Sequence, residues 1–130
     1  MKSLIIKSQN EKPHIWFNTE TNVFEIDGDF YSTQTSEMGQ SLNSWLEKYL
    51  TKNTSPISLN IKCCHYPSSS YDSLIHVLTL FRDFYTQSKG FVMVNWFVNF
   101  SDARIIDQIK SFKTKLGTLP INILKAHLKD

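Results

Sequence analysis

Several residue types are scarce in this chain, and each scarcity argues against a class of protein. The 130 residues include four glycines, and none belongs to a glycine-rich loop that could cradle a phosphate. The two cysteines, Cys63 and Cys64, are adjacent, so on a strand they point to opposite faces and cannot easily bridge each other. Without a C-x-x-C pair, zinc and thioredoxin-like sites lack a framework. A reducing, cytoplasmic location is therefore expected.

The chain also lacks a large excess of positive or negative charge, and it lacks long apolar runs. Fourteen basic and twelve acidic residues give a formal net charge of +2 at pH 7, too small to indicate nucleic acid or an anionic membrane as a partner. No apolar run approaches the roughly 18 residues of a transmembrane helix, and the run after Met1 is too short for a signal peptide. The composition, 41% hydrophobic and 13% aromatic, predicts one globular domain over residues 1–130.

Hydrophobic periodicity predicts the element order β-β-α-β-α-β-α-β. Alternation at 57–64, with Ser58, Asn60 and Lys62 at the even positions, predicts a strand with one covered face and one wet face. Strands joined through helices imply a largely parallel sheet, which an opening hairpin makes mixed, with the helices mainly on one face. The predicted strands are 13–17, 22–26, 57–64, 91–98 and 120–124, the predicted helices are 35–51, 69–88 and 102–116, and 1–7 is a candidate edge strand.

Candidate catalytic groups are present, but their arrangement does not support a reaction. Cys64 and His65 are neighbours, and neighbouring strand side chains diverge, so they cannot act as nucleophile and base on one substrate. None of the four histidines has a second ligand-type residue at metal spacing. Turn chemistry explains the acidic residues Asp27 and Asp29 near Glu25. We therefore predict a protein that is not an enzyme, with no catalytic residue, no metal and no cofactor.

The most informative segment connects the strand at 57–64 with the helix at 69–88. After Pro67 it carries three consecutive hydroxyls, Ser68, Ser69 and Ser70. They stand at a predicted helix N-terminus, where backbone N–H groups and the macrodipole favour an anion. One of them can cap the helix, which is the commoner reason for such a pattern. The alternative is a phosphoacceptor, because phosphate adds about −1.5 to −2 charges and three acceptor oxygens.

Motifs spread over nearly the whole chain match a known family. They are Pro13-x-Ile15-x-Phe17-Asn18, Phe24-x-Ile26-x-Gly28, Tyr31, Trp45-Leu46-x-x-Tyr49, His65-Tyr66-Pro67-Ser68-Ser69-Ser70, Leu74-x-x-Val77-Leu78, Val94-x-Trp96-Phe97 and Leu119-Pro120-Ile121. In these motifs the chain resembles the SiaC-like regulatory phosphoproteins, first catalogued as a domain of unknown function. The resemblance implies a STAS-like α/β fold: a mixed, mostly parallel sheet with an N-terminal β-hairpin and helices mainly on one face.

The resemblance also implies a function. In that family a kinase phosphorylates a serine or threonine in this turn, a PP2C-type phosphatase removes the phosphate, and the unmodified protein binds and activates a diguanylate cyclase. By position, Ser68 matches the acceptor, with Ser69 and Ser70 as alternatives. The chain is thus expected to be a bacterial signalling regulator with protein partners only. The residues expected to contact a partner are Tyr31, His65, Tyr66, Pro67 and Tyr71.

Two other functions remain open from the sequence. A STAS-type antagonist would bind an anti-sigma kinase in place of a cyclase. A carrier of a small apolar ligand would need a pocket lined by Trp45, Phe81, Phe84 or Trp96. The tryptophans Trp16, Trp45 and Trp96 fall on core-periodic positions, so buried packing is expected of them.

Overall fold

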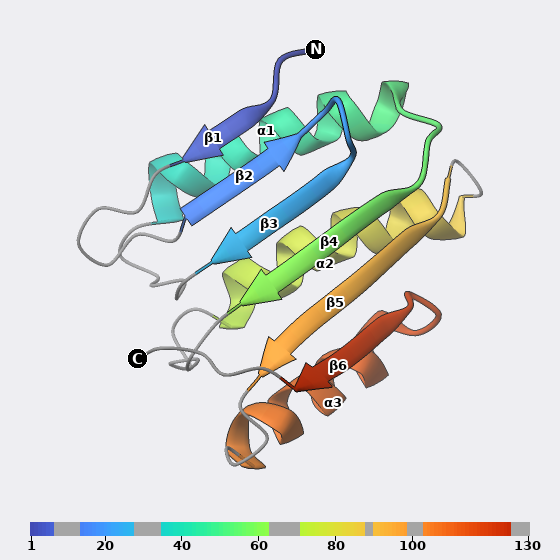
Figure 1. Ribbon diagram of the computed structural model, residues 1–130. Coiled ribbons are helices and arrows are strands. Elements are labelled where there is room, and N and C mark those ends of the chain that lie inside the picture. The colour runs from blue at the N-terminus through green and yellow to red at the C-terminus, as the bar shows by residue number, and fades with distance from the viewer. Residues whose placement is uncertain (7–13, 28–34, 63–70, 88–89, 99–102, 126–130) are drawn as a thin grey trace.

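The computed structural model describes residues 1–6, 14–27, 35–62, 71–87, 90–98 and 103–125, with the backbone alone at 14, 35–39 and 71–73. In these ranges, six strands form one sheet in chain order, β1 to β6 (Figure 1). The strands are β1 Leu4–Ile6, β2 His14–Asn18, β3 Val23–Asp27, β4 Ile57–Lys62, β5 Val92–Val98 and β6 Ile121–Lys125, and the helices are α1 Thr35–Lys52, α2 Tyr71–Thr86 and α3 Ala103–Leu116.

β2 runs opposite to the other five strands of the sheet. β1 pairs antiparallel with β2, and β2 pairs antiparallel with β3. From β3 to β6 every neighbouring pair is parallel, because α1, α2 and α3 each return the chain to the starting edge between successive strands. The mixed sheet with an opening hairpin, predicted from the sequence, is confirmed, and so is the edge strand near the N-terminus.

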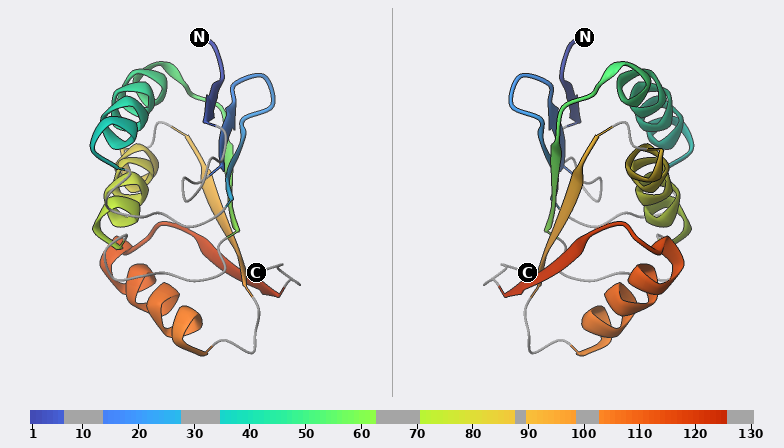
Figure 2. Two further views of the ribbon diagram at one scale, coloured as in Figure 1. Left: turned by 90° about the vertical axis from the view of Figure 1, so that its left-hand side faces the viewer. Right: turned by 90° about the vertical axis from the view of Figure 1, so that its right-hand side faces the viewer.

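The three helices lie on the same face of the sheet, and within the described ranges no other helix or strand covers the opposite face, which we call the open face (Figure 2). Alternation within the strands explains this arrangement. In β4, Ile57, Leu59 and Ile61 are buried, whereas the intervening residues are partly exposed. Helices pack against the apolar face of such a strand, whereas its polar face can remain in water. The prediction of helices mainly on one face is therefore confirmed.

The core fills the space between the sheet and the helices. The stripe predicted for α3 is buried as a whole and consists of Ile105, Ile109, Phe112 and Leu116. Under α2, the Phe81 ring makes edge contacts with Phe17 and Phe24, with centroids 6.3 and 6.1 Å apart. Gly117, at φ 63°, ends α3 as predicted.

Trp16 departs from the prediction, since its side chain is 43% exposed. Ile15 and Phe17 on either side of it are buried toward the helices, so strand alternation turns Trp16 to the open face beside Ile5, its partner in the register. The other two tryptophans follow the expectation: Trp96 is fully buried and Trp45 is partly buried against the core.

Candidate functional site

At one edge of the sheet, parallel strands end and helices begin. β3 ends there at Asp27, β4 at Lys62 and β5 at Val98, and the three helices begin at the same edge (Figure 1). In open α/β sheets, ligands bind beyond the carboxyl ends of the strands. The N-terminal ends of the helices also carry positive partial charge, which favours an anion near them. We call this side of the molecule the switch edge.

The predicted phosphoacceptors belong to the connection between β4 and α2. Ser68, Ser69 and Ser70 lie outside the described residues, and so do the predicted contact residues Tyr31, His65, Tyr66 and Pro67. Tyr71 is the first residue of α2, and its backbone alone is described. In the sequence, Ser70 directly precedes α2. The assignment of these residues to a site therefore stays a prediction, while the elements on either side of them are in place.

Both elements that flank the serine segment are anchored in the core. β4 pairs with β3 on one side and with β5 on the other. Its residues Leu59 and Ile61 are fully buried, as are Leu74 and Phe81 of α2. A functional segment held between rigid elements can be modified without loss of the surrounding structure. The architecture is thus suited to present a modified side chain at the switch edge.

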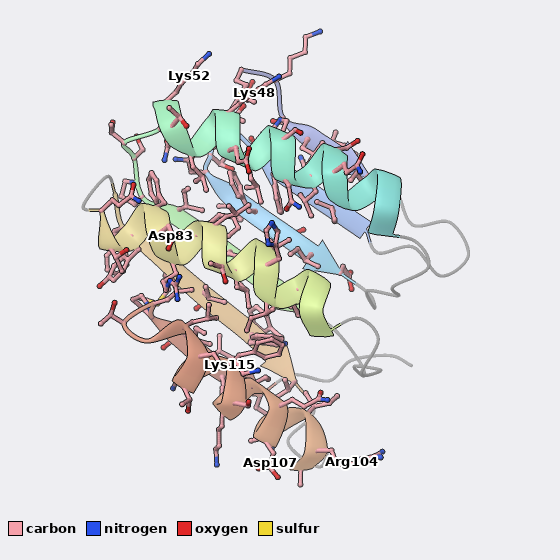
Figure 3. The ribbon with its side chains drawn as sticks, turned by 180° about the vertical axis from the view of Figure 1, so that it is seen from behind. Lys48, Lys52, Asp83, Arg104, Asp107 and Lys115 are labelled. Carbon is pink, nitrogen blue, oxygen red and sulfur yellow. The ribbon has the colours of Figure 1, made fainter. Side chains whose placement is uncertain are left out.

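Basic side chains contribute to the charge of the described part of the switch edge. Lys62 ends β4 and stands beside Asp27 in the register. Its Nζ lies 5.7 Å from the centroid of the Phe97 ring, at the distance of a cation–π contact. Arg104 lies in the first turn of α3 (Figure 3), which has no acidic residue. Such cations, together with the helix N-termini, favour a phosphate at this edge.

The opposite edge carries a partly buried polar cluster, which we call the clasp: Asn22, Tyr49, Asn53 and Pro56. Asn22 Nδ2 donates hydrogen bonds to Asn53 Oδ1 and to the Pro56 carbonyl oxygen, both at 3.1 Å. Asn22 Oδ1 accepts a hydrogen bond from the Tyr49 hydroxyl. These bonds join the β2–β3 turn to the end of α1 and the start of β4. The clasp was not predicted, because its residues come together only in the folded chain.

Replacing Tyr49 with phenylalanine is expected to lower the free energy of unfolding by about 1–2 kcal/mol at pH 7, because buried Asn22 Oδ1 loses its donor. Burial raises the pKa of the Tyr49 hydroxyl. The native state therefore keeps this proton after the unfolded chain has lost it, and stability falls as the pH rises above the ordinary tyrosine pKa of about 10.

The phenylalanine variant lacks this proton, so the stability difference from the wild type should shrink above about pH 10. Urea unfolding of both proteins at neutral and at alkaline pH measures the difference. An identical difference at both pH values would contradict a buried, protonated Tyr49 in the clasp.

A cavity between α1 and α2 gives little support to a small-ligand carrier. Its volume is about 160 Å³, below the roughly 300–1,000 Å³ of typical ligand pockets. Of the four side chains predicted to line a ligand pocket, Phe84 alone lines this cavity. Phe81 and Trp96 are fully buried; the Trp96 ring lies 5.3 Å from the Phe112 ring, centroid to centroid.

Within the described ranges, no three side chains among histidine, cysteine, aspartate and glutamate are grouped closely enough to hold a metal ion. None of the helices in those ranges combines the length and apolar character needed to cross a bilayer.

Comparison with known proteins gives one family and several structural neighbours. The model of the "SiaC family regulatory phosphoprotein" matches residues 6–126. SiaC of Pseudomonas aeruginosa has 19% sequence identity and a TM-score of 0.83, over 97% of this chain and 100% of that one. The structure of the P. aeruginosa diguanylate cyclase SiaD in complex with its activator SiaC matches at 19% identity and a TM-score of 0.85, over 95% of this chain and 99% of that one. No curated protein matches the sequence significantly.

Proposed function

The chain belongs to the SiaC family of regulatory phosphoproteins, and we propose that it is a non-enzymatic regulator switched by phosphorylation of Ser68. Ser69 and Ser70 are the alternative acceptors. The observation that carries the proposal is the position of these hydroxyls in the chain, directly before α2, which begins at the switch edge. A phosphate attached there meets helix N-termini and nearby cations, so the fold can tolerate it.

The proposed partner is a diguanylate cyclase, bound by the unphosphorylated form in the cytoplasm. The complex of SiaD with its activator SiaC, whose SiaC fold this chain shares, supports a partner of this class. A serine/threonine kinase would add the phosphate, and a PP2C-type phosphatase would remove it. The proposed contact residues surround the serines in the sequence or precede α1 in the sequence: Tyr31, His65, Tyr66, Pro67 and Tyr71.

Phosphorylation would weaken this contact by a simple physical effect. A docked partner excludes water from the serine segment, and removing a doubly charged group from water is costly unless the docked protein supplies further cations to pair with it. The free protein leaves the same group in water near the positive ends of the helices. The phosphate would therefore destabilise the complex more than the free protein.

Charge substitution at Ser68 tests the proposal. Ser68→Asp should weaken binding to a GGDEF-containing cyclase of the same organism by about tenfold or more, which corresponds to about 1.4 kcal/mol. Ser68→Ala should bind as tightly as the wild type. Each variant should unfold within about 1 kcal/mol of the wild type, the usual size of a cap effect. Isothermal titration calorimetry and urea unfolding measure the two quantities.

The matched control is Ser55→Asp, which introduces the same charge at an exposed residue near the clasp. It should leave cyclase binding unchanged. If the Ser68→Asp and Ser68→Ala variants bound the cyclase with equal affinity, the serine segment would act only as a helix cap. Capture of an anti-sigma kinase, with no cyclase bound, would instead support the STAS-type antagonist.

A further inference from the structure

The open face of the sheet, away from the helices, has an ordered polar centre. Asn95 Nδ2 donates to Asn60 Oδ1 at 3.0 Å, and Asn122 Nδ2 donates to Asn95 Oδ1 at 3.2 Å. This row of amides fixes side chains across β4, β5 and β6. By register and alternation, the described open-face residues are Ile5, Trp16, Asn18, Val23, Glu25, Asp27, Ser58, Asn60, Lys62, Met93, Asn95, Phe97, Asn122 and Leu124.

Large apolar side chains surround this centre. Ile5 is 56% exposed, Trp16 43%, Val23 39% and Leu124 37%. The outer side of the helices differs in kind, because it carries charged residues along its length (Figure 3), including Lys48, Lys52, Asp83, Arg104 and Asp107. Interface centres are depleted of charge and enriched in aromatic residues and methionine. The open face thus has the composition of a protein–protein interface.

The few charges on the open face are arranged in a self-complementary way. Glu25 and Asp27 are acidic and lie on β3, whereas the basic Lys62 lies on β4 at the level of Asp27. A twofold axis parallel to the strands, midway between β3 and β4, would set β3 of one copy over β4 of the other. Two equivalent pairs would form, one on each side of the axis, and in each pair Asp27 of one copy would face Lys62 of the other.

Other orientations of the axis lack this match. An axis at right angles to the strands would set β3 over β3 of the second copy and bring acidic residues together. Packed sheets cross at about 30° because each is twisted, which displaces the outer strands most and the two strands beside the axis least. Because Asp27 and Lys62 lie on the two strands beside the axis, twist displaces their pairs less than contacts between the outer strands.

We propose that the open face is a self-association surface, on which a second copy packs sheet against sheet about this axis. Six strands of about five residues, at about 4.8 Å between strands and about 3.3 Å per residue, give a face of roughly 450 Å² in plan. That is at the small end of specific interfaces, so the dimer forms and dissociates with protein concentration. The proposal concerns the unphosphorylated protein, and its test requires no kinase.

A charge exchange between two copies tests this arrangement. Asp27→Lys places two lysines opposite two lysines, and Lys62→Asp places two aspartates opposite two aspartates, so each variant alone should dimerise at least about tenfold more weakly than the wild type. An equimolar mixture of the two variants restores both opposite-charge pairs in a heterodimer. Analytical ultracentrifugation over a wide concentration range should then show that the mixture associates like the wild type.

The controls are Lys48→Asp and Asp107→Lys, which make the same charge changes on the helix side (Figure 3), and both should dimerise normally. Circular dichroism of each variant verifies folding, and an unfolded variant could not be rescued by mixing. A wild-type protein that stays monomeric at every concentration would overturn the proposal. So would a mixture that remains monomeric while the wild type dimerises, or a partner protein other than a second copy as the sole occupant of the open face.

Discussion

Replacing Phe81 with alanine is expected to lower the free energy of unfolding by about 3–5 kcal/mol. The Phe81 side chain is fully buried, and its ring meets Phe17 of β2 and Phe24 of β3 edge to face. Truncation removes these contacts and leaves a cavity under α2. Because single domains are stable by only about 5–15 kcal/mol in total, the variant should unfold at much lower urea concentration.

Phe91→Ala is the matched control for this substitution. Phe91 is also a phenylalanine in contact with another ring, Tyr85, at 5.8 Å between centroids, but it is 46% exposed. Its truncation should cost less than about 1 kcal/mol. Equal losses for the two variants would contradict the central position of Phe81 in the core. Through α2, the Phe81 variant should also weaken partner binding, since the serine segment would lose one of its two anchors.

Replacing Asn22 with alanine is expected to cost about 2–4 kcal/mol, the second largest effect. The Tyr49 hydroxyl loses Asn22 Oδ1 and keeps only the longer bond to Asn53 Oδ1 at 3.4 Å, and the part-buried bond to the Pro56 carbonyl oxygen is lost; a buried group left unpaired costs about 1–3 kcal/mol. Asn22 also has φ 57°, a left-handed conformation that disfavours alanine by about 1–2 kcal/mol relative to glycine.

Asn22→Gly separates the two contributions. Glycine accepts the left-handed backbone but loses the same side-chain hydrogen bonds. It should therefore be more stable than Asn22→Ala by about 1 kcal/mol and still less stable than the wild type. Thermal and urea unfolding of the three proteins give the comparison. If the glycine variant matched the wild type, the clasp hydrogen bonds would contribute nothing to stability.

Periodicity in the sequence predicted most of the fold because burial here follows secondary structure closely. Alternation in β4 identified its buried side, and the spacing of Ile105, Ile109, Phe112 and Leu116 identified the buried stripe of α3. The same rule, applied strictly, would have placed Trp16 correctly, because Ile15 and Phe17 beside it compete for the covered face. Its aromatic character was a weaker guide than its position in the strand.

Features that depend on tertiary contacts could not be predicted. The second helix was predicted to extend to residue 88, yet α2 already ends at Thr86. Gly90 is needed for close packing, since a Cβ there would lie 2.7 Å from Phe84 Cζ. The clasp likewise joins residues up to 34 positions apart, and its separate parts have no common sequence signal.

The site itself was predicted from sequence order and family resemblance. The structure describes the two elements that bound the serine segment, and their core anchors agree with the strand–turn–helix expectation. Which of Ser68, Ser69 and Ser70 accepts a phosphate is a chemical question, because all three are serines beside the same helix start. Direct mapping of the modification answers it.

The most direct measurement is mass spectrometry of the protein after incubation with its partner serine/threonine kinase and ATP, followed by titration of the cyclase with the modified protein. We predict one phosphate in the peptide that contains residues 68–70, and binding of the cyclase at least about tenfold weaker than to the unmodified protein. Phosphate found only elsewhere in the chain, or unchanged binding by protein modified at 68–70, would contradict the proposed switch.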